Sequence, residues 1–173
     1  VEARRDPSAI FRESILGIVY PNAILNVKGN YALRPFATIL RTIEALDGLL
    51  CRDEMIVGPL CLDDDRDNEK FLTMVEAIRS LRGNWSKLNR KIENVSRERR
   101  ISRNTMENYT RFPLAVLKWT GWTQNERRKN VYGRSIPFLV LTDEGRKTLQ
   151  MIETHRDIRA VDLDNVDNDT KAA

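Results

Sequence analysis

The stretch from Gly121 to Met151 constrains the fold of this chain more than any other segment. Residues 131–141 mostly favour extended backbone, with interruptions at Gly133 and Pro137. Basic and polar residues are concentrated between positions 127 and 134. Thr142 then offers a side-chain oxygen that can cap a helix, and the two acidic residues after it suit the positive end of that helix. The pattern predicts a strand, a basic polar loop, a second strand and a final helix.

The loop of this strand pair is expected to be cationic, which is typical of the wing in a winged-helix protein. Its basic residues are Arg127, Arg128, Lys129 and Arg134.

The segment before the wing has the composition of a DNA-recognition helix. Ser102 is a good N-cap for it. We expect three side chains to face inward, namely Met106, Tyr109 and Phe112, and three to face outward, namely Asn104, Asn108 and Arg111. Pro113 removes a backbone donor, so the helix should kink or restart there. The fold class that follows is mainly α with a small β-hairpin, a winged helix-turn-helix.

Apolar spacing predicts further helices on either side of this unit. They cover residues 8–20, 34–46, 49–57, 68–81 and 85–95, and the last helix runs from Thr142 to about Arg156. The second and third of them would form the first half of a helix-turn-helix arrangement. We divide the chain into a lead-in helix and loop (1–30), a winged-helix DNA-binding domain (31–156) and an acidic linker or disordered tail (157–173).

Charge is distributed unevenly along the sequence. Residues 82–134 hold 14 Lys or Arg against 4 Asp or Glu, whereas the whole chain has a formal net charge of only +4. A basic block of this kind favours contact with phosphates, although a solvated helical surface would look similar. The expected DNA-phosphate contacts are Lys87, Arg90, Lys91, Arg97, Arg99, Arg100, Arg103, Arg127, Arg128 and Lys129. The expected contacts to base edges are Asn104, Asn108, Arg111 and Arg134.

Other chemistry is sparse in the sequence. The acidic run 63–67 lacks the Gly and the twelfth-position Glu of an EF-hand, which argues against a calcium site. We interpret it as the acidic approach to the next helix, whose N-terminal end favours negative charge. Cys51 and Cys61 have no partners at metal spacing and are expected to be reduced core thiols. We interpret Trp85, Trp119 and Trp122 as residues of the core or as anchors of the wing, in preference to residues that stack on bases. We expect no metal, no cofactor and no catalytic residue in this chain.

The sequence also favours a cytoplasmic protein without membrane contact. No apolar run approaches the length of a membrane span, and the first residues have no signal-peptide core. The chain does not start with Met, and we expect it to be part of a longer protein.

Two segments resemble a known family. Residues 31–55 are similar to the start of the second DNA-recognition domain in AlwI/BstNBI-type (type IIS) restriction and nicking endonucleases, where an apolar helix, a Gly, a Leu and a short acidic-apolar helix follow one another. Residues 119–122, Trp-Thr-Gly-Trp, look like the aromatic-Thr-Gly-aromatic step of that family, and residues 141–145 look like the entry to its final helix. The similarity covers about residues 30–153.

The resemblance implies a sequence-recognition module whose nuclease domain or subunit lies outside this chain. That domain would carry a Glu-x-Lys metal site, and the only related triplet here is residues 169–171 in the polar tail. We therefore expect double-stranded DNA as the partner and no cleavage by this chain alone. A winged-helix transcription regulator and a winged-helix protein-interaction module stay open as alternatives.

Overall fold

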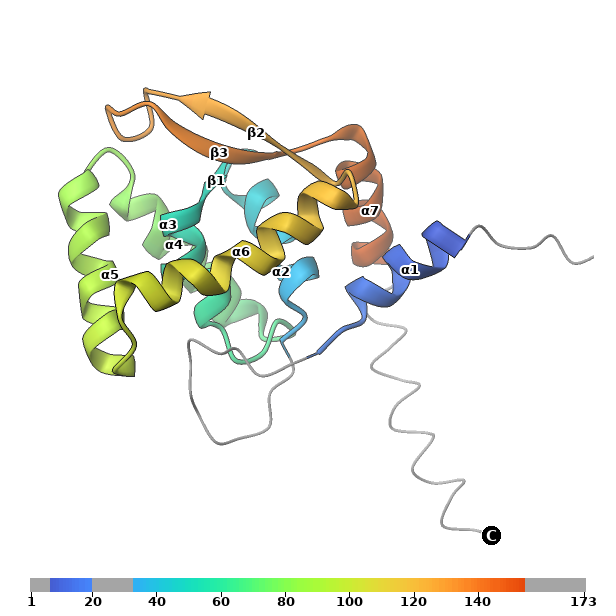
Figure 1. Ribbon diagram of the computed structural model, residues 1–173, viewed down its shortest axis with the longest axis horizontal. Coiled ribbons are helices and arrows are strands. Elements are labelled where there is room, and N and C mark those ends of the chain that lie inside the picture. The colour runs from blue at the N-terminus through green and yellow to red at the C-terminus, as the bar shows by residue number, and fades with distance from the viewer. Residues whose placement is uncertain (1–6, 20–32, 155–173) are drawn as a thin grey trace, which may run out of the picture.

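The computed structural model describes residues 7–19 and 33–154, and all structural statements below concern these residues (Figure 1). The elements in chain order are α1 (Pro7–Leu16), α2 (Pro35–Ala45), β1 (Leu50–Cys51), α3 (Arg52–Val57), a 3-10 turn η1 (Pro59–Cys61), α4 (Asn68–Leu81), α5 (Trp85–Arg99), α6 (Arg103–Trp119), β2 (Thr123–Arg128), β3 (Ile136–Leu141) and α7 (Asp143–Thr154). The loop expected at residues 22–31, the end of the last helix and the acidic tail lie outside the described residues.

The described part is mainly helical and carries one small antiparallel sheet, which confirms the coarse fold class. The strands are ordered β1-β3-β2, so the hairpin strand β3 lies between its partner β2 and a third strand. Figure 1 shows the hairpin along one edge of the molecule, α6 crossing in front of the other helices, and α5 at one end.

The third strand was not predicted. Leu49 to Val57 was expected to form one short helix, but Leu50 and Cys51 are extended and pair with Leu139 and Phe138 of β3. The helix α3 begins only at Arg52, where Glu54 turns back to accept a hydrogen bond from the backbone N–H of Cys51 at 2.9 Å. Tertiary pairing with β3 therefore overrides the local helical pattern.

The hairpin also differs from its prediction. Arg127 and Arg128 belong to β2, and only Lys129 and Arg134 of the four cations lie in the loop. Pro137 does not interrupt β3, because it lies beyond the end of β1, where β3 has a neighbour on one side only.

One hydrophobic core joins the helices to the sheet. Buried side chains of α2, α3, α4, α5, α6, α7 and β3 belong to a single cluster, in which Trp122 and Phe36 are the largest fully buried members. Two residues of α1, Ile15 and Leu16, also join it. The lead-in helix ends at Leu16 rather than near residue 20, and the other apolar residues of its expected stripe, Ile10, Phe11 and Ile18, are exposed.

Helix α6 continues as one helix across Pro113. The carbonyl that loses its donor there belongs to Tyr109, an exposed residue at which solvent can take the place of that donor. Tyr109 and Phe112 were expected to face inward, but they are 42% and 61% exposed. The buried face of α6 consists instead of Met106, Thr110, Pro113 and Leu117. After Met106, this face is displaced by one residue from the predicted one, from Tyr109 to Thr110 and from Phe112 to Pro113.

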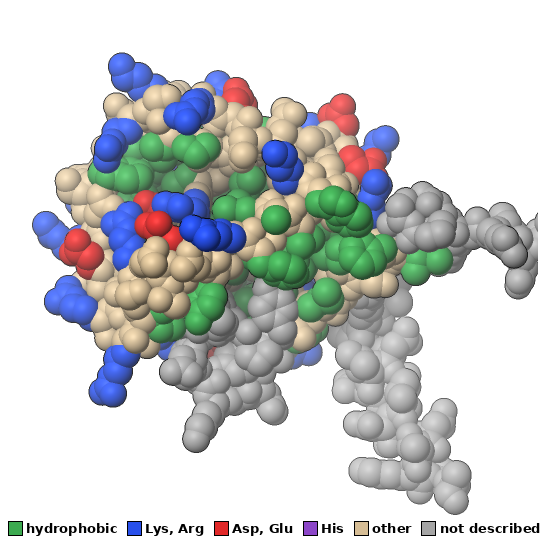
Figure 2. All heavy atoms as spheres, in the orientation of Figure 1, with side chains coloured by type: hydrophobic (Ala, Val, Ile, Leu, Met, Phe, Trp, Pro, Cys, Tyr) green, Lys and Arg blue, Asp and Glu red, His purple; other side chains and the backbone are tan. Residues whose placement is uncertain are grey.

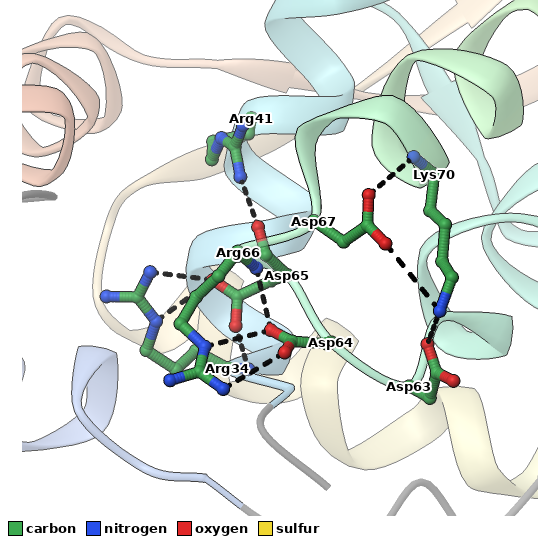
Figure 3. Close-up of polar contacts among 8 residues, drawn as sticks. All are labelled: Arg34, Arg41, Asp63, Asp64, Asp65, Arg66, Asp67 and Lys70. Atoms are coloured by element: carbon green, nitrogen blue, oxygen red, sulfur yellow. Dashed lines mark hydrogen bonds and ion pairs between the residues drawn. The ribbon is translucent and has the colours of Figure 1, made fainter. Parts of the chain in front are cut away.

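The acidic run before α4 is occupied by the protein's own cations (Figure 3). Asp65 is fully buried and accepts two hydrogen bonds from the Arg34 side chain, at 2.9 and 2.7 Å, and one from its backbone N–H. Asp67 caps α4 by accepting from the backbone N–H of Lys70, as the acidic approach to this helix predicted. Among residues 7–19 and 33–154, no three His, Cys, Asp or Glu side chains are grouped so that they could hold a metal ion.

Cys51 and Cys61 form no disulfide among the described residues; Cys51 is buried in the core, as expected, whereas Cys61 is only half-buried. None of the described helices combines the length and the apolar character that crossing a membrane requires.

Candidate nucleic-acid interface

The outward face of α6 carries a row of polar side chains without partners. Asn104, Asn108, Arg111 and Lys118 lie on one side of the helix, at steps of three and four residues that the apolar Ala115 continues between Arg111 and Lys118. All five are exposed. The side chains of the two Asn, of Arg111 and of Lys118 form no hydrogen bond or ion pair with the described residues. This row is available to a ligand.

The hairpin places four cations at one end of the molecule. Arg127 donates to the backbone carbonyl of Ser135 at 3.4 Å. Arg128 pairs with Glu126 at 2.6 Å, and both side chains of this pair are more than two-fifths exposed. Lys129 and Arg134 are also exposed. A surface ion pair of this kind is weak, so Arg128 can exchange Glu126 for a phosphate at little cost.

A buried hydrogen bond anchors the loop of the hairpin. The hydroxyl of Tyr132 donates to the carboxylate of Glu54 at 2.7 Å, and Arg82 donates to the same carboxylate at 2.9 Å. Burial and the negative charge of Glu54 raise the pKa of Tyr132 above its usual range, so the phenol stays a donor at every physiological pH. The tyrosine ring also lies edge-on to Trp85 and parallel to Phe138. The loop is thereby attached to α3, α5 and β3.

Arg134 lies over the ring of Trp85, with its guanidinium carbon 5.0 Å from the ring centroid. This cation–π contact and the hydrogen bond from the Gly83 N–H to the Val131 carbonyl, at 2.8 Å, hold the loop beside the start of α5.

The basic side chains of α5 extend the positive charge away from the hairpin. Those predicted to contact phosphate are Lys87, Arg90, Lys91, Arg97 and Arg99, with Arg100 directly after the helix. All are exposed except Arg99, which is half-buried. Lys87 lies near the hairpin end of α5, whereas residues 97–100 lie at the opposite end, next to the start of α6. The predicted phosphate contacts of α5 are therefore spread along its whole length, from the hairpin end to the start of α6.

Arg103 differs from the other predicted phosphate contacts, because it already has acidic partners. It pairs with Asp53 at 3.1 Å and with Glu107 at 3.1 Å, and it donates to Asn89 at 3.0 Å. Arg52 shares both carboxylates, at 3.7 and 3.3 Å. Burial raises the pKa of Asp53, and the two arginines oppose that rise.

A pocket of about 590 Å³ lies between α6 and the hairpin. Its walls are mostly apolar, and charged or polar side chains complete its lining (Figure 2). The apolar members are Leu50, Cys51, Trp85, Leu114, Ala115, Ile136, Pro137 and Leu139, and the others are Arg52, Asp53, Arg103, Lys118, Thr123, Gln124 and Asn125. On the face shown in Figure 2, Lys and Arg side chains lie above and below this apolar area.

Sequence reasoning missed Lys118, Gln124 and Asn125 as site residues. Lys118 continues the three- and four-residue spacing of Asn104, Asn108 and Arg111, so the sequence held the signal for it. Gln124 and Asn125 held none, because the strand pairing that brings them beside α6 depends on tertiary structure.

Trp119 and Trp122 have opposite environments. Trp122 is buried, as expected of a core residue, whereas Trp119 is 64% exposed and contacts Phe11 of α1 edge-on at 5.2 Å.

No family model matches the chain, and neither the curated proteins nor the solved structures contain a significant match to it.

Proposed function

We propose that this chain binds double-stranded DNA, with α6 in the major groove and the hairpin as a wing against the phosphate backbone. The observation that carries the proposal is the unpartnered polar row on α6, formed by Asn104, Asn108, Arg111 and Lys118, next to a cationic hairpin. Asn and Arg have the donor and acceptor geometry that reads adenine and guanine in the major groove. Exposed Arg and Lys supply contacts to phosphate.

The element order supports a winged-helix interpretation of the fold. A winged helix has a first helix, a short strand, two further helices and a hairpin, and its short strand pairs with the second hairpin strand. Here α2, β1, α3, α6 and the β2–β3 hairpin follow that order, and β1 pairs with β3. The helices α4 and α5 would then be an insertion between α3 and α6, and α5 contacts both of these helices.

The more specific assignment, a sequence-recognition module of a type IIS restriction endonuclease with its nuclease domain elsewhere, rests on the resemblance of residues 31–55, 119–122 and 141–145. Under this proposal the chain discriminates DNA sequences in the cytoplasm and does not cleave them.

One observation favours a protein-interaction module as the second candidate. Tyr109, Phe112 and Trp119 expose aromatic rings along α6, beside the exposed Phe11 of α1. Exposed apolar side chains grouped in this way are typical of protein contacts. This aromatic face of α6 is adjacent to the polar row. DNA binding would therefore depend on the polar row, and a protein contact on the aromatic residues of the same helix.

The test is a titration of random-sequence duplexes at two salt concentrations, with and without Mg²⁺, read by fluorescence anisotropy. Replacing two wing cations, Arg127→Ala with Arg128→Ala, should weaken binding equally on all sequences. It should also reduce the slope of log K against log salt by about 1.8, since each phosphate contact contributes about 0.9.

The control removes the same charge elsewhere, by Arg66→Ala with Lys70→Ala, whose side chains pair with Asp63, Asp64 and Asp67. It should leave the salt slope unchanged. An unaltered slope in the hairpin variant would exclude the wing from the interface, and no binding at low salt would exclude the function.

A further inference from the structure

The pocket between α6 and the hairpin has the size and wall chemistry of a small-molecule site. Ligand pockets are usually concave, mostly apolar and about 300–1,000 Å³ in volume, and this one measures about 590 Å³. Trp85, Leu114 and Leu139 offer flat or branched apolar surface, and residues from α3, α5, α6 and the three strands line the pocket, which is open to solvent on one side. An aromatic ring system would fit these walls.

One polar group in the wall has no partner. Thr123 lines the pocket, is 3% exposed, and its hydroxyl forms no hydrogen bond in the described structure. The hydroxyl oxygen itself is almost inaccessible, so Thr123 contributes to the shape of this wall rather than a hydrogen bond to a ligand. Gln124 and Asn125 add exposed amides beside it, on the same strand.

The charges around the pocket leave one cation unmatched. Arg52 and Arg103 pair with Asp53 and Glu107, so these four side chains balance one another. Lys118, the third cation of the lining, is exposed and has no acidic partner among the described residues. The surplus is a single positive charge at the α6 side of the pocket.

We propose that this pocket binds a small apolar molecule that carries one negative charge, of the class of aromatic carboxylates. The ring system packs against Trp85 and the aliphatic side chains, and the carboxylate pairs with Lys118. The ligand site needs no DNA and stands independently of the proposed function.

The test uses 2-naphthoate as the probe and its neutral amide, 2-naphthamide, as the comparison. Each is titrated into the isotopically labelled chain without DNA, and backbone amide shifts are followed by NMR. Naphthoate should give saturable shifts centred on Leu50, Ala115 and Thr123, and it should bind at least severalfold more tightly than the amide.

Two variants separate the charge from the cavity. Lys118→Met keeps the aliphatic stem but loses the charge, so naphthoate affinity should fall to that of the amide. Ala115→Trp fills the pocket from an exposed helix position and should abolish binding of both probes, while the dispersed amide spectrum shows that the chain is still folded. Lys147→Met, on the exposed surface of α7, removes the same charge elsewhere and should change neither affinity.

Shifts centred on the exposed aromatic residues of α1 and α6, or no saturation, would overturn the proposal. Equal affinity of Lys118→Met and the parent chain for naphthoate would overturn it as well. Failure of DNA binding in the anisotropy titration would leave these results unaffected, so the two proposals can fail separately.

Discussion

Gly145 lies in the first turn of α7 and packs against the backbone of Trp122, the residue that precedes β2. Its backbone N–H donates to the Thr142 hydroxyl at 3.1 Å, which is the predicted N-cap of α7. The Thr142 N–H in turn donates to the Trp122 carbonyl at 3.0 Å. A Cβ at position 145 would overlap that same carbonyl oxygen, so this position requires glycine because of a close backbone approach.

Gly145→Ala should therefore destabilise the fold although alanine favours helices. Backbone atoms on both sides must move to admit the methyl group, and we expect a loss of about 2–3 kcal/mol in the free energy of unfolding. The measurement is urea denaturation followed by circular dichroism. Gln150→Ala, an exposed position on the same helix, is the control and should change stability by less than about 0.5 kcal/mol. Equal stability of both variants would contradict the steric argument.

Capping residues were the most predictable features at this scale, because a cap depends on neighbours in the sequence. Ser102 and Thr142 cap α6 and α7, as their types suggested. The roles of Glu54 and Asp65 could not be predicted. Their partners, Tyr132 and Arg34, lie far away along the chain, and no local pattern indicates such contacts.

At the scale of elements, α6 is the centre of the candidate interface. Its only carboxylate is Glu107, which pairs with Arg103 at 3.1 Å and with Arg52 at 3.3 Å. This negative charge lies beside the polar row that we propose for DNA, and it competes with phosphate for both arginines.

Glu107→Gln should consequently tighten DNA binding. Removing one repulsive charge and releasing two arginines should add about 1 kcal/mol at low salt, roughly a fivefold lower Kd. The anisotropy titration described above measures this change. Glu69→Gln, an exposed position in the first turn of α4, removes the same charge away from α6 and should leave Kd unchanged. A weaker or unchanged Kd for Glu107→Gln would argue against DNA contact by this face.

Helices were predicted better than strands because their apolar period is contained within a single segment. The bounds of α2 and α4 agree with the spacing of their apolar residues to within about a residue. In contrast, β2 is a polar strand, Thr-Gln-Asn-Glu-Arg-Arg, which only its pairing with β3 makes extended. For the same reason the pocket between β2 and α6 was invisible in the sequence.

At the scale of the whole molecule, one buried ion pair attaches the entry of α2 to the segment before α4. Asp65 is inaccessible to solvent, and the Arg34 side chain that binds it is only 15% exposed. Arg41 also donates to the Asp65 backbone carbonyl, at 2.9 Å. These bonds connect parts of the chain that are separated by β1 and α3 (Figure 3).

Asp65→Ala should destabilise the whole fold, because it leaves the guanidinium of Arg34 without its carboxylate. Breaking a buried pair in this way costs about 3–5 kcal/mol. The matched control is Asp63→Ala, whose partner Lys70 is exposed, and which should cost less than about 1 kcal/mol. Urea denaturation compares the two. Similar losses in both variants would mean that Asp65 contributes no more than a surface charge.

The hydrogen bond between Tyr132 and Glu54 has a consequence for how the hairpin meets a partner. A hairpin fastened at its loop by a buried contact gives up little conformational entropy on binding, since its loop is already ordered. A partner would then bind a hairpin that is already rigid rather than a flexible one. The residence time of the complex would depend on the phenol of Tyr132, which is buried and does not contact the bound molecule.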